Sequence, residues 1–140
     1  MGQDKPLVFV IDDDSDSLDI TAQILRAGRL DCRCFPDPQE ALAHLAQEIP
    51  DLIVSDLMMD SLHAGFAFAE QVKADPRTRD VPVVMVTSVG SLMGLDFEPR
   101  SERDLAAMNI DAFFHKPLQA APFLANVWEL LSKRPGTERP

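Results

Sequence analysis

The chain has 140 residues, of which 46% are hydrophobic and 26% are charged, as expected for one globular domain with its own core. Its net charge of −10 argues against a nucleic-acid-binding protein, which needs a basic face to neutralise phosphates. The N-terminal sequence MGQDKP lacks the apolar core of a signal peptide, and no apolar run approaches the length of a membrane span. A cytoplasmic protein is therefore expected.

Short apolar runs alternate with amphipathic segments from the N-terminus onward. Leu7–Ile11 is uninterrupted and rich in β-branched residues, which predicts a strand buried on both faces. A helix is expected next, with Ser15 as its cap. Asp31–Phe35 predicts a weaker strand near a sheet edge, and Pro38 predicts the start of a helix that reaches about Glu48.

The second half of the chain continues this alternation. Leu52–Ser55, Val81–Ser88 and Asp111–Pro117 predict three more strands. Helices are expected over about Gly65–Ala74 and Ala121–Lys133. The residues expected to face the core from these two helices are Phe66, Ala69, Val72, Phe123, Val127, Leu130 and Leu131.

Five apolar strands that alternate with helices predict a parallel sheet with helices on both faces. The expected fold is therefore α/β, doubly wound and flavodoxin-like, with a single domain over residues 1–134 and a disordered tail over 135–140. Cys32 and Cys34 fall on one face of their predicted strand, which is poor disulfide geometry, and no second pair completes a zinc site. Both are expected to be reduced and buried.

Charged and polar residues follow the predicted strands at their carboxyl ends, where open α/β sheets form their sites. These residues are Asp12, Asp13 and Asp14 after the first strand, Asp56 after the third, Thr87 and Ser88 in the fourth and Lys116 in the fifth. Gathered carboxylates repel one another unless a cation joins them, and hard oxygen ligands favour Mg²⁺. A lysine and a hydroxyl nearby suit a phosphoryl group, with Asp56 as the candidate nucleophile and Asp14 as a helix cap.

The segments VFVIDDDSDS, PDLIVSDLMM, VPVVMVTS and FFHKP, in this order, resemble the receiver domain of bacterial two-component response regulators. The resemblance covers about Pro6 to Lys133. It implies that Asp56 accepts a phosphoryl group from a phosphohistidine on a sensor kinase. It also implies that Asp13 ligates Mg²⁺ directly, Asp12 ligates it through water, and Asp56 and the backbone carbonyl of Met58 complete the protein ligands.

The same resemblance implies a switch. Thr87 matches the hydroxyl residue that moves toward the phosphoryl oxygens, Lys116 matches the lysine that pairs with them, and Phe113 matches the aromatic residue that turns inward. The Lys116–Pro117 peptide bond is expected to be cis. The region of the fourth helix, the fifth strand and the last helix would form the face that partners read.

The sequence departs from the family pattern in the loop after Asp56. Asp60 and Ala64 stand where the family usually has proline and glycine, and Gly65 comes one residue late. His63 is either a residue that tunes dephosphorylation or a solvated loop residue.

The segment between Thr87 and Lys116 is longer than usual for the family. A short helix over Glu102–Met108 is expected there. Two alternatives stay open for the apolar residues before it: a docking surface, or a loop folded over its own core. These residues are Leu92, Met93, Leu95 and Phe97.

The function expected from the sequence is that of a stand-alone phosphoacceptor receiver, which catalyses only its own phosphorylation and dephosphorylation. Its expected partners are a histidine kinase or histidine phosphotransfer domain and a downstream protein, with no nucleic acid and no membrane. One alternative is an aspartate-nucleophile, Mg²⁺-dependent phosphohydrolase. The other is a pseudo-receiver, a binding module that is never phosphorylated.

Overall fold

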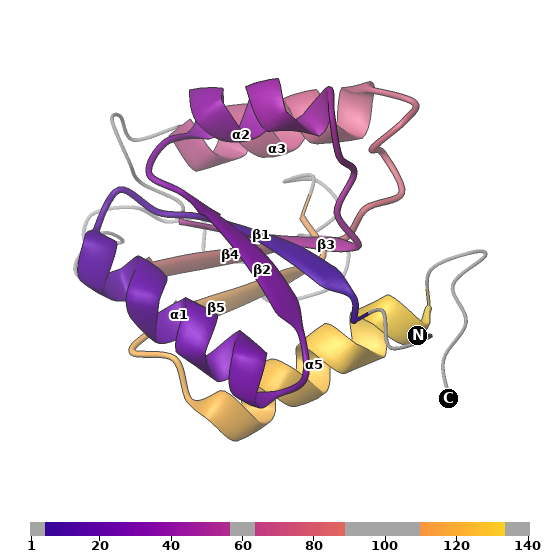
Figure 1. Cartoon of the computed structure of the whole chain (residues 1–140). Coiled ribbons are helices and arrows are strands. Elements are labelled where there is room, and N and C mark those ends of the chain that lie inside the picture. The colour runs from indigo at the N-terminus through magenta and orange to yellow at the C-terminus, as the bar shows by residue number, and fades with distance from the viewer. Residues whose placement is uncertain (1–4, 57–63, 89–109, 134–140) are drawn as a thin grey trace.

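The computed structural model describes residues 5–56, 64–88 and 110–133 (Figure 1). Within them the chain forms a five-stranded parallel sheet in the order β2-β1-β3-β4-β5. The strands are β1 (Leu7–Ile11), β2 (Asp31–Phe35), β3 (Leu52–Asp56), β4 (Val83–Ser88) and β5 (Ala112–Lys116). The helices are α1 (Ser15–Ala27), α2 (Pro38–Leu45), α3 (Ala64–Ala74) and α5 (Ala120–Ser132). The predicted doubly wound α/β fold is confirmed.

The helices cover both faces of the sheet, with α2 and α3 over one face and α1 and α5 over the other (Figure 1). Successive strand residues therefore enter different cores. Val8 and Val10 of β1 belong to the cluster under α1 and α5, whereas Phe9 and Ile11 belong to the cluster under α2 and α3. This double burial explains why the central strands are apolar at nearly every position.

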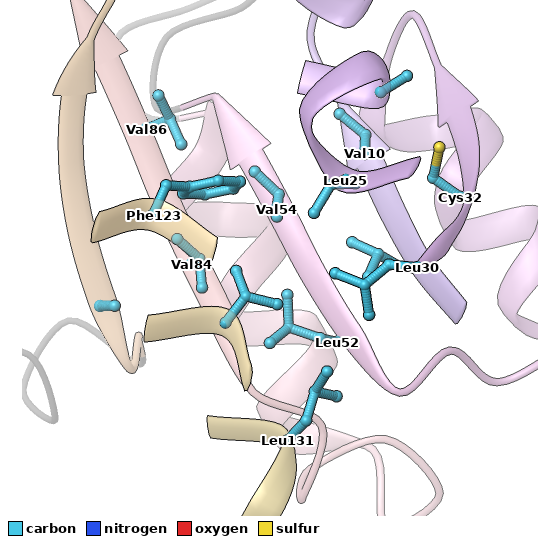
Figure 2. Packing of buried hydrophobic residues seen from close by; sticks show 14 residues of the cluster. Val10, Leu25, Leu30, Cys32, Leu52, Val54, Val84, Val86, Phe123 and Leu131 are labelled. Atoms are coloured by element: carbon cyan, nitrogen blue, oxygen red, sulfur yellow. The ribbon is translucent and has the colours of Figure 1, made fainter. Parts of the chain in front are cut away.

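Figure 2 shows the first of these clusters, in which side chains of the sheet meet those of α1 and α5. Leu25 of α1 and Phe123 and Leu131 of α5 are fully buried against the strands. Val127 is also fully buried and Leu130 is partly buried, so the predicted inner face of α5 is confirmed. In α3, Ala69 and Val72 are buried as expected, and the side chain of Phe66 lies outside the described part of the structure.

The ends of two helices test the sequence prediction. Of the two caps expected for α1, Asp14 is confirmed, because its side chain accepts the N–H of Asp16, whereas Ser15 is the first residue of the helix. Helix α2 ends at Leu45 instead of near Glu48. Pro50 disfavours helical geometry at Ile49, and the residues before it form turns in which the N–H groups of Gln47 and Glu48 both donate to the His44 carbonyl oxygen.

The cysteines also differ from expectation in one respect. Both are free thiols and Cys32 is buried, but Cys34 is exposed. Strand β2 is an edge strand with one neighbour, β1, so the sheet covers it less completely than the central strands.

Helices α1 and α5 touch at the end of α1. The Trp128 indole Nε1 donates a hydrogen bond to the Gly28 carbonyl oxygen at 3.1 Å. A Cβ atom at Gly28 would lie 2.5 Å from a methyl carbon of Leu124, so the close approach of the two helices favours glycine there. None of the helices described by the structure has the length and apolar character needed to cross a bilayer.

Candidate functional site

Strands β1 and β3 are neighbours, and each delivers an aspartate to the carboxyl edge of the sheet. Asp12 directly follows β1 and is 4% exposed, whereas Asp56 ends β3 and is 8% exposed. Asp13 is exposed. One carboxylate oxygen from each of these three residues lies within 4.8 Å of the others. The structure thus brings together the three aspartates that the resemblance implied as metal ligands.

Lys116, the last residue of β5, reaches this cluster from across the sheet. Its Nζ atom lies 2.8 Å from Asp12 Oδ2, 3.6 Å from Asp56 Oδ2 and 3.1 Å from Ser17 Oγ. Partial burial opposes its charge, but the hydrogen bond to Asp12 and the charges of Asp56 and Asp12 raise the pKa of Lys116 above its ordinary value. Lys116 is therefore a positive charge held among carboxylates.

The other oxygen of Asp12 is also engaged, because Asp12 Oδ1 accepts the backbone N–H of Asp14 at 2.9 Å. The Asp12 N–H donates to the Phe35 carbonyl oxygen at 3.1 Å, which continues the pairing of β1 with β2 one residue past the strand. The Asp12 carboxylate is consequently held in place by backbone on one side and by Lys116 on the other.

The charged form of Asp56 lies in an unfavourable environment. Burial and the negative charge of Asp12 raise its pKa to about 7, and the attraction of Lys116 offsets this only in part. One ammonium is thus insufficient to neutralise the cluster. A set of three carboxylates short of positive charge, with no histidine or cysteine among them, fits a hard divalent cation such as Mg²⁺.

Thr87 and Phe113 lie on the two strands beside the cluster. Thr87 is fully buried in β4, one residue after the position that pairs with Asp56. Phe113 is partly buried in β5 and packs against the core under α2 and α3. The Lys116–Pro117 bond is cis, as the sequence resemblance implied.

Several predicted features lie outside the described residues. They are the Met58 carbonyl ligand, Asp60 and His63, the apolar residues Leu92, Met93, Leu95 and Phe97, the helix over Glu102–Met108 and the tail 135–140.

Ser17 is a site residue that the sequence analysis missed. Besides its contact with Lys116, its hydroxyl donates to Asp14 Oδ2 at 3.2 Å. Ser17 and Lys116 also line a cavity of about 360 Å³ together with Ile20, Thr21, Pro117 and Leu118. The available signal was the spacing of Asp14 and Ser17, because residues three apart face the same side of a helix.

The strand order reverses between β1 and β3, and the acidic cluster lies at the carboxyl ends of these two strands. Fold and site together define a doubly wound α/β protein with a cation-compatible acidic site at its switch point. The sequence model of the response regulator receiver domain matches residues 8–127. The chain belongs to this family of phosphoacceptor signalling domains of two-component systems, as the sequence predicted.

Curated relatives are longer than this chain. The chain is 30% identical over 132 residues to the DNA-binding dual master transcriptional regulator RpaA of Synechocystis sp., a match that covers 91% of the chain and 50% of RpaA. It is 33% identical over 82 residues to the response regulator PleD of Caulobacter vibrioides, covering 59% of the chain and 18% of PleD. The chain thus spans half or less of the length of these relatives.

Solved structures share the fold. The signal receiver domain of a histidine kinase from Syntrophus aciditrophicus superposes with a TM-score of 0.76 at 24% identity, and 96% of each chain is covered. The chemotaxis response regulator CheY4 of Vibrio cholerae gives a TM-score of 0.74 at 20% identity, covering 91% of this chain and 99% of that one.

Proposed function

We propose that Asp56 is the residue that accepts the phosphoryl group. The observation that carries the proposal is the place of its carboxylate: buried at the end of a central strand, within 4.8 Å of Asp12 and Asp13 oxygens and 3.6 Å from the Lys116 ammonium. An acceptor carboxylate needs positive charge around the oxygens of the incoming group more than it needs acid–base help. Asp56 also ends a central strand, and burial together with the charge of Asp12 raises its pKa.

The proposed donor is a phosphohistidine on a histidine kinase or a histidine phosphotransfer domain. An Asp56 carboxylate oxygen forms a bond to phosphorus while the phosphorus–nitrogen bond breaks, and the histidine nitrogen keeps the electron pair of that bond. Hydrolysis of the acyl phosphate then returns Asp56 and inorganic phosphate. We propose no other catalytic activity for this domain.

Asp12, Asp13 and Asp56 are the proposed ligands of Mg²⁺, with the Met58 carbonyl as the remaining predicted protein ligand. Bound Mg²⁺ would supply the positive charge that the cluster lacks. Lys116 is already held at this edge and is proposed to pair with the phosphoryl oxygens, and the Thr87 hydroxyl is proposed to donate to them. Movement of Thr87 is proposed to let Phe113 turn inward and so to shift the population of two conformations.

Proposed partners are the phosphodonor and a downstream protein that reads β5, α5 and the segment before them. We infer a cytoplasmic location from the same role. RpaA is named as a DNA-binding regulator and the chain matches half of it, so the expectation that this domain makes no nucleic-acid contact stays a prediction.

The proposal is tested by incubating the protein with a small acyl-phosphate donor, with and without Mg²⁺, and separating the products on a phosphate-affinity gel. Wild type should give a Mg²⁺-dependent shifted band, which Asp56→Asn should abolish. Asp16→Asn is the matched control, because Asp16 is an exposed aspartate of α1 outside the cluster. A wild type that never shifts would refute the proposal, and sustained phosphate release from small phosphomonoesters would favour a phosphohydrolase instead.

A further inference from the structure

Ser17 connects the start of α1 to the ammonium of Lys116. Its hydroxyl donates to Asp14 Oδ2 at 3.2 Å and accepts from Lys116 Nζ at 3.1 Å. Asp14 is itself fixed, since its other carboxylate oxygen accepts the Asp16 N–H at 3.1 Å and caps the helix. Because a hydroxyl has a single proton, donation to Asp14 leaves its lone pairs for Lys116. The helix cap therefore sets the direction in which Ser17 receives the lysine.

The three oxygen partners of Lys116 differ in kind. Asp12, at 2.8 Å, and Asp56, at 3.6 Å, belong to the carboxylate cluster proposed to hold the cation. Ser17 is neutral and does not belong to that cluster. Any positive charge that neutralises the carboxylates weakens their attraction for Lys116, whereas the Ser17 hydrogen bond does not depend on that attraction.

A cavity beside Lys116 leaves the lysine side chain room to move. Ser17 and Lys116 both line the cavity of about 360 Å³, whose wall also includes the apolar side chains of Ile20 and Leu118. The flexible four-carbon stem of a lysine can move into such space when its ammonium is not tied. A tether outside the carboxylate cluster keeps the ammonium next to Asp56.

We propose that Ser17 is a positioning residue for Lys116, which it holds at the edge of the sheet ready to pair with the transferred phosphoryl group. The proposal rests on the proposed function, in which Lys116 pairs with the phosphoryl oxygens. It gives α1 a role in the chemistry through a hydroxyl that touches neither the phosphoryl group nor the metal.

The first test observes Lys116 directly, without donor, in metal-free buffer and at saturating Mg²⁺. Proton–nitrogen correlation spectra of lysine ammonium groups are recorded at mildly acidic pH and low temperature, with Lys116→Met to assign the signal. The ammonium signal should be protected from water exchange in wild type and in Ser17→Thr, which keeps the hydroxyl, in both buffers. In Ser17→Ala the Asp12 carboxylate should still protect it in metal-free buffer, and the signal should be lost once Mg²⁺ weakens that attraction. Ser15→Ala is the matched control, because Ser15 is an exposed serine of the same helix turn.

The second test measures phosphorylation by a small acyl-phosphate donor at saturating Mg²⁺. Loss of one hydrogen bond to a charged group should slow Ser17→Ala by about three- to ten-fold through the maximal rate, with the donor concentration for half-maximal rate unchanged. Ser17→Thr should recover the wild-type rate to within about two-fold, and Ser15→Ala should match wild type.

The two tests fail in different ways. A protected Lys116 signal in Ser17→Ala at saturating Mg²⁺, or a Ser17→Ala rate equal to wild type, would overturn the positioning role. Equal slowing in the alanine and threonine variants would also overturn it, because packing and not the hydroxyl would then matter. If wild type accepts no phosphoryl group, the proposed function fails, and the spectra still decide whether Ser17 holds Lys116.

Discussion

Two lysine–aspartate pairs lie at opposite ends of the parallel strands and have different surroundings. At the amino end, Lys73 Nζ donates to Asp111 Oδ2 at 3.0 Å and to the carbonyl oxygens of Val81 at 2.9 Å and Arg79 at 3.4 Å. Asp111 Oδ2 also accepts the N–H of Val83 at 2.8 Å. One carboxylate therefore meets one ammonium, and neutral backbone groups supply the remaining contacts.

At the carboxyl end, Lys116 faces the carboxylates of both Asp12 and Asp56, and Asp13 adds a third negative charge. The comparison shows how a structural ion pair differs from a candidate binding site. The amino-end pair is complete in itself and ties α3 to β4 and β5. The carboxyl-end cluster lacks positive charge, and a metal ion would supply it.

The largest expected difference concerns the two lysines. Lys73→Met should lower the free energy of unfolding by about 1 to 2 kcal/mol, because it leaves Asp111 and two carbonyl oxygens without their ammonium at a partly exposed site. Lys116→Met should cost about 2 kcal/mol in metal-free buffer near neutral pH, and Mg²⁺ should restore most of it. Denaturant unfolding with and without Mg²⁺ checks both values.

If both variants lost the same stability with and without Mg²⁺, the two ends of the strands would not differ in their response to a metal ion, and the comparison would be wrong. The matched comparison is internal, since each lysine is the control of the other.

The next effect is a pH dependence of the free energy of unfolding, caused by Asp56 at the carboxyl end of the strands. Asp56 keeps its proton up to about pH 7 in the folded protein, whereas its ordinary pKa is 3.8. The folded state binds more protons between these values, so stability is highest at the acidic end and falls as pH rises toward 7. The expected fall in metal-free protein is about 2 kcal/mol, with allowance for screening by water near the carboxylate.

Asp56→Asn isolates this contribution, because an amide does not titrate. The stability of wild type minus that of Asp56→Asn should decline between about pH 4 and 7, measured by urea unfolding in a metal chelator. A difference that stays constant with pH would contradict the raised pKa of Asp56.

A smaller effect tests the exposed member of the cluster. Asp13→Asn should weaken the apparent Mg²⁺ affinity about ten-fold, since one carboxylate charge is lost from a site that depends on charge count. The Mg²⁺ concentration that half-maximally raises the melting temperature is the measured quantity. Asp16→Asn should leave it unchanged, and an equal weakening in both variants would point to general surface charge instead of ligation.

The smallest expected effect concerns a hydrogen bond at the amino end of the strands. Asp51 Oδ2 accepts the backbone N–H of Leu7 at 2.7 Å, a bond between the segment before β3 and the first residue of β1. Asp51→Asn should lower the free energy of unfolding by about 1 kcal/mol at neutral pH and leave phosphorylation at the wild-type rate. A slowed phosphorylation in this variant would show that the two ends of the sheet are coupled.

Much of the fold could be predicted because the sheet buries both faces. Strands such as Leu7–Ile11 must then be apolar throughout, and the strand order places their carboxyl ends on one edge. The meeting of Asp12, Asp13, Asp56 and Lys116 follows from that geometry. Their roles in phosphoryl transfer stay predictions.

The errors have local causes. Ser15 and Asp14 are both good caps, and only backbone geometry decides between them. The exposure of Cys34 depends on how far neighbouring elements cover an edge strand. The spacing of Asp14 and Ser17 signals only their contact within the helix, and the contact of Ser17 with Lys116 could not be foreseen because the two lie 99 residues apart in the chain. Contacts of this length depend on tertiary structure and not on sequence pattern.

The contact between Trp128 and Gly28 gives the protein an intrinsic fluorescence probe for the packing of α1 against α5. Trp128 is the single tryptophan of the chain, and its indole is hydrogen-bonded at the far end of α1 from the acidic cluster. A helix of 13 residues is about 20 Å long, so a metal ion among the carboxylates is too distant to quench the indole by contact. Separation of α1 from α5 would expose the indole to water and should shift its fluorescence emission to longer wavelength. Occupation of the acidic site by a metal ion should by itself leave the fluorescence spectrum nearly unchanged.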